Sequence, residues 1–159
     1  ATYKGKYVVL EWINFDCPFV VKHYSSDNMP NLQKKYTAKE VVWLSICSSA
    51  PGAQGHFEGD ELFERCEKEN YSGTAYLIDE DGKVGHLYGA KTTPNMYVVN
   101  PEGVLIYTGA IDSIKSTKVE DIEKATNYVQ AALDAAMAGE KVATSSTAPY
   151  GCGIKYAKK

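Results

Sequence analysis

The sequence predicts an α/β protein in which helices flank a central mixed β-sheet. Three observations support this prediction: apolar, β-branched runs recur along the chain, helical patterns alternate with them, and a short turn joins the last two runs. This order of elements implies a mixed sheet with helices on both faces. At 159 residues, the chain is long enough for one domain with a sizeable core.

The first half of the chain contains two predicted strands, two helices and a long loop. Residues 6–13 and 41–47 are apolar runs typical of buried strands. Proline favours the first turn of a helix, so Pro18 predicts that one helix begins there and continues to residue 36. Prolines and glycines make 48–59 a loop of the kind that often belongs to a functional site, and 61–70 has the apolar spacing of a short helix.

The second half of the chain contains three predicted strands and a long final helix. Thr117 with Glu120 resembles a capping box and predicts that this helix begins at residue 118. In order, we expect a strand at 74–78, one or two helical turns at 84–89, a strand at 92–100, its hairpin partner at 104–109 and the helix at 118–138.

Glycine is a natural helix stop, so Gly139 predicts the end of the last helix. We therefore expect residues 1–139 to form a single domain. Residues 140–159 are rich in Ser, Thr and Pro in their first half and are expected to form an extended tail. This tail is predicted to pack on the domain or to reach toward it.

Composition excludes several classes of protein. The net charge is −3, from 17 basic and 20 acidic residues, so the sequence has no electrostatic footprint for nucleic acid or an anionic membrane. No apolar run approaches membrane-spanning length. The chain enters a core strand almost at once, which suggests a processed or trimmed protein. The expected location is left open: cytoplasmic, or periplasmic or secreted after loss of a signal segment.

The four cysteines are sparse and widely spaced. None forms a CxxC pair, and cysteine and histidine show no zinc-ligand spacing, so we expect neither a metal nor a cofactor. Cys47 ends a predicted strand and Cys66 lies on the apolar face of a predicted helix, so both are expected to pack in the core.

Cys17 has a different setting, at the junction of a predicted strand and a predicted helix. Unpaired N–H groups and the positive end of the helix dipole favour a thiolate at that position. Asp16 would act in the opposite direction and raise the pKa of a neighbouring thiol. From the local pattern alone, a reactive cysteine and a buried cysteine that behaves as a small hydrophobe both remain open.

With this element order and the Cys-Pro pair, the sequence resembles the thioredoxin fold, and within it the AhpC/TSA-type, peroxiredoxin-like redoxins. The resemblance covers nearly the whole chain. Its marks are EWIN at 11–14, DCPFV at 16–20, SSAPG at 48–52, YGAKTTP at 88–94, YTGAID at 107–112 and GCGIKY at 151–156.

The resemblance implies roles for particular residues. Cys17 matches the active-site cysteine, which is peroxidatic in peroxiredoxins and the attacking cysteine in thioredoxin-like reductases. Pro94 matches the cis-proline that faces this cysteine, so the Thr93–Pro94 bond is expected to be cis. The implied partners are a peroxide or disulfide substrate and a thiol electron donor of unknown identity. The resemblance also implies two N-terminal family strands that the sequence lacks.

The sequence departs from both family patterns. Asn14 stands where peroxiredoxins carry Thr or Ser, three residues before the active-site cysteine. The only arginine, Arg65, lies on a predicted helix far along the chain, whereas peroxiredoxins use an arginine to polarise the peroxide. Val20 occupies the position of the second cysteine of a CxxC motif. The sequence therefore lacks part of the residue set of the peroxiredoxin mechanism and part of that of the CxxC reductases.

The first hypothesis is a thiol redox enzyme. Cys17 attacks a peroxide or a disulfide, and Cys152, between two glycines on the tail, is the candidate resolving thiol. A tail that merely packs on the domain remains an equal alternative for Cys152. The candidate supporting residues are Asn14, Asp16, Pro18, Lys22, His23, Thr93 and Pro94. Of these, His23 is expected to lie on the surface rather than to act as a base.

Two further hypotheses remain. One is a non-catalytic binding module of thioredoxin fold, which would hold a peptide or a copper ion with Cys17 as one ligand. Copper chaperones of related fold need a second cysteine near the first, and Val20 removes it. The other is a structural relic in which Cys17 is simply buried.

Overall fold

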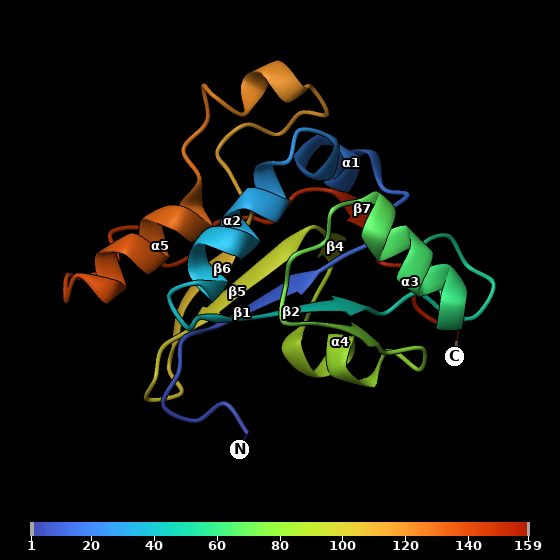
Figure 1. The fold of residues 1–159 in the computed structure, drawn as a ribbon, viewed down its shortest axis with the longest axis horizontal. Coiled ribbons are helices and arrows are strands. Elements are labelled where there is room, and N and C mark those ends of the chain that lie inside the picture. Colours follow the sequence, from blue (N-terminus) through green and yellow to red (C-terminus); the bar gives the residue numbers. More distant parts are fainter. Residues whose placement is uncertain (1, 159) are drawn as a thin grey trace.

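The computed structural model describes residues 2–158 and contains the predicted mixed sheet (Figure 1). Its five strands are β1 Val8–Trp12, β2 Val42–Cys47, β3 Ala75–Ile78, β5 Asn95–Val99 and β6 Leu105–Gly109. They lie in the order β3-β2-β1-β5-β6. The central strand β1 pairs in parallel with β2 and antiparallel with β5. Cys17, five residues beyond β1, therefore starts from the middle of the sheet.

Helices cover both faces of this sheet. They are α1 Pro18–Ser25, α2 Asn28–Thr37, α3 Gly59–Lys68, α4 Lys83–Tyr88, the 3₁₀ helix η1 Val119–Asp121 and α5 Tyr128–Met137. α1, α2 and α5 lie on one face and α4 lies on the other (Figure 1). Within residues 2–158, no helix is long and apolar enough to cross a membrane.

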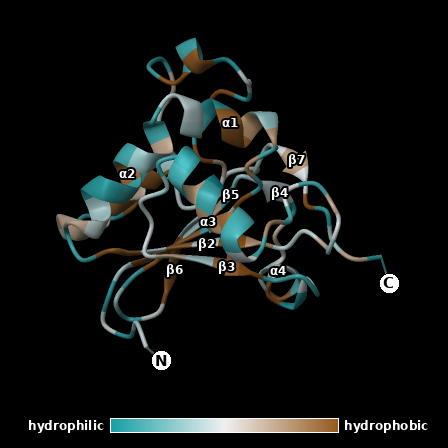
Figure 2. Ribbon diagram, turned by 45° about the vertical axis from the view of Figure 1, so that its right-hand side comes forward, coloured by the Kyte–Doolittle hydropathy of each residue, from teal (hydrophilic) through white to brown (hydrophobic). Residues whose placement is uncertain are grey.

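Successive side chains of β1 point to opposite faces of the sheet and pack in two separate cores. Val9 packs with apolar side chains from α1, α2 and α5, in the cluster that also contains Cys17. Leu10 and Trp12 point to the opposite face and pack with Ile46 and Tyr97. Figure 2 shows hydrophobic residues along the strands and hydrophilic residues over much of α2 and α3. Strands and helices alternate in the sequence because the apolar side chains on both faces of the sheet need a cover.

The prediction of one helix over 18–36 is wrong, because α1 and α2 are separate. Asp27, between them, has a left-handed backbone with φ 57°. Pro30 explains the break: in a continuous helix its ring would clash with the carbonyl of Ser26, four residues earlier, and it has no N–H to donate. In the first turn of α2, the missing donor costs nothing.

The predicted helix at 118–138 is also wrong in its first half. Only η1 forms near the Thr117 cap, and α5 begins ten residues later, where the Asn127 side chain accepts a hydrogen bond from the Gln130 N–H at 2.9 Å. The intervening chain pairs with the segment after β6: Tyr128 N–H donates to the Ile111 carbonyl. Long-range pairing thus overrides the local helical pattern.

The tail forms a second, two-stranded sheet with the main domain. β7 Cys152–Gly153 pairs antiparallel with β4 Thr92–Thr93, which precedes Pro94. Beyond β7, the Ala50 N–H donates to the Lys155 carbonyl at 2.8 Å. The tail thus returns to the end of the sheet where Cys17 lies, beyond the carboxyl end of β1. The division into a domain at 1–139 and a tail at 140–159 stays a prediction.

Glu11 is a fully buried carboxyl group in the middle of β1. It accepts hydrogen bonds from Tyr24 at 2.8 Å, Trp43 at 2.8 Å, Ser45 at 2.8 Å and Gln33 at 3.2 Å. Burial raises the pKa of Glu11, and the four donors act against that rise. The network joins α1 and α2 to the central strands beneath them.

We expect Glu11→Ala to destabilise the protein by about 3 kcal/mol or more, because it leaves several buried donors without an acceptor. Glu11→Gln keeps one acceptor oxygen and the side-chain volume, so it should cost clearly less. Urea unfolding of both variants measures the difference. Losses below about 1 kcal/mol in both variants would contradict the view that the hydrogen-bond network of Glu11 stabilises this part of the core.

Candidate functional site

Cys17 lies at the N-cap of α1, where the sequence placed it. Pro18 occupies the first helical turn, as predicted, and the Val20 and Val21 N–H groups both donate to the Cys17 carbonyl at 2.8 Å. The side chain is fully buried. The thiol therefore lies at the positive end of a helix and away from bulk water.

The Thr93–Pro94 peptide bond is cis, as the family resemblance implied. The Thr93 carbonyl accepts a hydrogen bond from the Cys17 thiol at 3.1 Å. The Thr93 hydroxyl is buried and has no hydrogen-bond partner among residues 2–158. It can donate to the sulfur once Cys17 loses its proton, and this interaction lowers the pKa of Cys17.

The structure brings Cys152 to the same place, although 135 positions separate the two cysteines. In the β4–β7 pair, Cys152 lies directly opposite Thr93. Gly151 makes this approach possible: its φ is 151°, and a Cβ there would lie 2.0 Å from the Thr93 carbonyl oxygen. A side chain at this position would push the strands apart. Both cysteines are free thiols, and Cys152 is only half-buried.

The two thiols have opposite electrostatic character. Burial raises the pKa of Cys17, but hydrogen bonds from the Cys152 thiol, Thr93 and the backbone N–H groups of Cys152 and Val20 outweigh it, so the pKa is lowered overall. Burial and the Cys17 sulfur raise the pKa of Cys152 to about 11. Of the two thiols, Cys17 is thus the more acidic one, and Cys152 keeps its proton to higher pH.

Asp16, which the sequence suggested would raise the pKa of Cys17, is not among the main causes of its shift, and the contacts of Arg65 supply a reason. The Arg65 guanidinium forms an ion pair with Asp16 at 2.8 Å and donates to the Phe15 carbonyl at 3.0 Å. The carboxylate charge is therefore compensated beside the thiol. Arg65 lies far from Cys17 along the chain, so the sequence did not predict this contact. The loop after β2 brings the helix of Arg65 back to the end of the sheet where Cys17 lies.

The loop after β2, which the sequence predicted to be of the kind that belongs to a site, contacts the segment before Cys17. Asn14 donates to the Gln54 carbonyl at 3.3 Å and accepts from the Asp16 N–H at 2.9 Å. A Cβ on Gly55 would lie 2.3 Å from the Asn14 side chain. The Asn14 side chain therefore links the segment before Cys17 to this loop, because its NH₂ group and its carbonyl oxygen are both hydrogen-bonded.

Lys22 and His23 lie in a second polar cluster around Asp112. The surface position predicted for His23 is wrong, because its side chain is fully buried. Burial lowers the pKa of His23 to about 4, with Asp112 acting against that shift and Lys22 with it. The ring is therefore neutral at physiological pH, and its Nδ1 accepts a hydrogen bond from Asn28 at 2.9 Å.

The other two cysteines lie outside the thiol pair. Cys47 is buried, as predicted, and donates to the Gly55 carbonyl at 3.3 Å. Cys66 is only partly buried against the core, so its prediction as a core residue holds in part. Burial raises the pKa of Cys66 to about 11.

One group of side chains has the residue types and spacing to hold a metal ion. The ligand atoms of His56, Glu58 and Glu80 lie within 4.8 Å of one another. His56 and Glu80 already pair with each other at 3.0 Å, and Glu58 is exposed. Two of the three side chains are thus already paired with each other.

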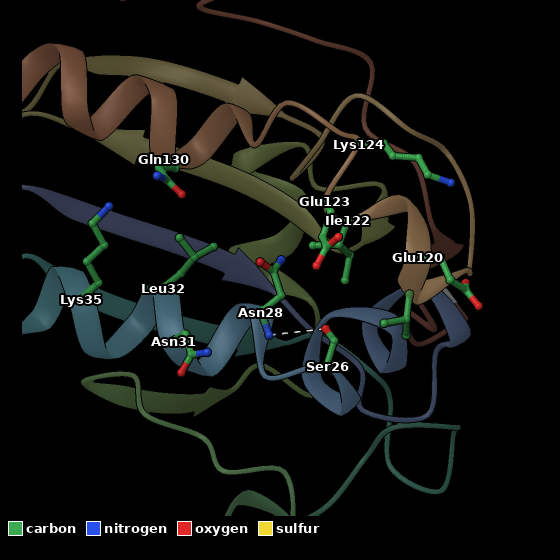
Figure 3. A pocket seen from close by; sticks show the side chains of 11 residues that line it. Ser26, Asn28, Asn31, Leu32, Lys35, Glu120, Ile122, Glu123, Lys124 and Gln130 are labelled. Atoms are coloured by element: carbon green, nitrogen blue, oxygen red, sulfur yellow. Dashed lines mark hydrogen bonds between the residues drawn. The ribbon is translucent and has the colours of Figure 1, made fainter.

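A cavity of about 750 Å³ lies between α2 and the segment around η1 (Figure 3). Its polar lining includes Asn28, Lys35 and Glu123, and Leu32 adds an apolar surface. None of the predicted site residues lines it. This cavity is thus separate from the thiol pair.

The thiol assignment predicts a pH dependence. The thiolate absorbance of reduced protein should titrate at Cys17 with a midpoint below the value of about 8.5 for an ordinary cysteine. Cys152→Ala removes a donor to the thiolate, so its midpoint should be higher than that of the wild type. Subtraction of a Cys17→Ser titration isolates the signal. A Cys17 midpoint at or above the ordinary value would contradict the assignment.

Solved structures of the same fold resemble this chain at low sequence identity. A hypothetical protein from Sinorhizobium meliloti matches with a TM-score of 0.81 and 23% identity, over 99% of this chain and 83% of that one. An uncharacterized conserved protein from Geobacillus kaustophilus matches with a TM-score of 0.82 and 24% identity, over 99% and 80%. A thioredoxin-like protein from Aeropyrum pernix matches with a TM-score of 0.54 and 17% identity, over 76% and 75%.

These likenesses show the thioredoxin fold. A search of curated proteins finds none that matches the sequence. The model of the AhpC/TSA family matches residues 1–108, which include Cys17 and the cis-proline. The chain is therefore a thioredoxin-like redoxin that belongs to the AhpC/TSA family.

Proposed function

We propose that this redoxin reduces peroxides, with Cys17 as the attacking thiolate. The sulfur attacks one peroxide oxygen and the O–O bond breaks, so Cys17 becomes a sulfenic acid. The other oxygen leaves as hydroxide or alkoxide and takes up a proton. The thiolate loses two electrons and the peroxide gains them.

Cys152 then resolves the sulfenic acid. Its sulfur attacks the Cys17 sulfur, a disulfide forms, and the sulfenic oxygen leaves as water with the Cys152 proton. Two thiol groups of an external donor reduce this disulfide and become a disulfide themselves. The cycle needs a peroxide and a thiol donor, and no bound cofactor.

The burial of Cys17 beside Cys152 carries this proposal. A fully buried sulfur beneath the β4–β7 pair favours a small oxidant, because a peroxide needs a smaller opening to reach it than a protein disulfide does. The raised pKa of Cys152 favours a protonated resolving thiol, which does not compete for the peroxide.

The surrounding residues have supporting roles in this proposal. Pro18 starts the helix whose N-terminus faces the thiol, and Thr93 offers its hydroxyl to the thiolate. Pro94 turns the chain so that the Thr93 carbonyl meets Cys17. Asn14 and Asp16 hold the segment before Cys17, through the site loop and Arg65.

Disulfide exchange is the second candidate function. The groups expected to polarise a peroxide are engaged elsewhere: Arg65 binds Asp16, Glu69 and the Phe15 carbonyl, and the Asn14 amide binds its own loop. A Cys17–Cys152 disulfide could instead pass to a dithiol by thiol–disulfide exchange, without any bound peroxide.

Stopped-flow tryptophan fluorescence of reduced protein mixed with hydrogen peroxide tests the proposal, with Trp12 in the strand before Cys17 as a reporter. We expect a second-order rate constant of about 10⁴ M⁻¹s⁻¹ or more, the low end of ordinary enzyme efficiency. Cys17→Ser should abolish the reaction. Cys152→Ser should retain the first step and accumulate a sulfenic acid that a dimedone probe labels.

Cys66→Ser is the matched control, because it removes a half-buried thiol outside the site and should leave the rate unchanged. A wild-type rate no faster than that of free cysteine would reject peroxide reduction. Rapid exchange with a model disulfide in the same protein would then establish the second candidate. Inertness toward both reagents would leave the non-catalytic binding module.

A further inference from the structure

The segment before Cys152 is bound to the domain at two points. At the first, the Thr147 N–H donates to the Thr108 carbonyl at 3.0 Å, and the Thr147 hydroxyl accepts from the Ala110 N–H at 2.9 Å. Gly109 leaves room for this contact, since a Cβ there would lie 2.3 Å from the Thr147 carbonyl oxygen. The segment therefore lies against the end of β6.

The second point is a buried carboxylate. Tyr150 donates its hydroxyl hydrogen bond to Asp112 Oδ1, and the Lys22 ammonium lies 3.4 Å from Asp112 Oδ2. All three residues are at most 7% exposed. His23 Nε2 lies 3.7 Å from the same oxygen as Lys22. Asp112 thus joins the tail, through Tyr150, to α1, through Lys22.

The same helix and the same tail also meet at the thiol pair. Cys17 and Phe19, at the start of α1, lie against Cys152 and Tyr150 of the tail. The Phe19 and Tyr150 rings touch edge-to-face with centroids 5.7 Å apart. Because Tyr150 is only two residues before Cys152, anchoring Tyr150 also restricts where Cys152 lies.

We propose that Asp112 and Tyr150 are positioning residues, which hold the tail so that the Cys152 thiol stays at Cys17. Asp112 in turn is fixed by Lys22 and by the Ile114 N–H, which donates to Oδ1 at 3.1 Å. The ion pair is buried and hydrogen-bonded on both sides, so its geometry is well determined. This inference deepens the proposed function, because it identifies what sets the effective concentration of the resolving thiol.

Tyr150→Phe tests the inference, because it removes one hydroxyl group and keeps the ring against Phe19. The reduced protein is equilibrated with glutathione redox buffers, and the Cys17–Cys152 disulfide is quantified by mass spectrometry. We expect the effective concentration of the two thiols to fall roughly tenfold, the scale of one lost hydrogen bond to a charged acceptor. The midpoint of the Cys17 pH titration should also rise, because the groups of Cys152 that donate hydrogen bonds to its sulfur move away.

Tyr36→Phe is the matched control. It removes another tyrosine hydroxyl that donates to a carboxylate, Asp134, at 2.6 Å, but between α2 and α5. It should leave both the disulfide equilibrium and the Cys17 midpoint unchanged. Urea unfolding of both variants confirms that each is folded under the assay conditions.

Neither measurement uses peroxide, so the inference and the proposed reaction fail separately. A wild-type disulfide equilibrium that Tyr150→Phe leaves unchanged would overturn the positioning role while peroxide reduction stands. Failure of glutathione to form any Cys17–Cys152 disulfide in the wild type would overturn it as well. Equal effects of Tyr150→Phe and Tyr36→Phe would mean general destabilisation and would also reject it.

Discussion

The contact between the Cys17 thiol and the Thr93 carbonyl is the point on which the site depends. Cys17 is placed by the central strand β1 and by the start of α1, and Thr93 by the chain that enters β5, the neighbour of β1. Thr93 also pairs with Cys152. One residue therefore connects the main sheet, the active-site candidate and the tail, and any shift of β4 would move both thiols relative to each other.

The chemistry follows from an unequal division of hydrogen bonds between two similar groups. Donors converge on Cys17, whereas Cys152 is itself one of those donors, so the proton remains on Cys152. Arg65 compensates the one carboxylate adjacent to the thiolate. The arrangement places the more acidic thiol beside one that keeps its proton, which is the combination that the proposed attack and resolution require.

The sequence predicted the parts of the structure that depend on local pattern: the strands, the cysteine at a helix start and, through the family resemblance, the cis-proline. It failed where distant residues decide. Asn127 begins α5 because the chain beside it pairs with the segment after β6, and His23 is buried because Asp112 and Asn28 surround it. The partners of Asp16 and Tyr150 lie 49 and 38 positions away, so no local signal could reveal them.

Peptide mapping of the reduced protein after one equivalent of hydrogen peroxide tests the central claim most directly. The account predicts a disulfide between Cys17 and Cys152, with Cys47 and Cys66 still reduced, because only the first pair combines a thiolate with an adjacent thiol. Oxidation scattered over the four cysteines, or a stable oxidised Cys17 beside a free Cys152 thiol, would contradict it.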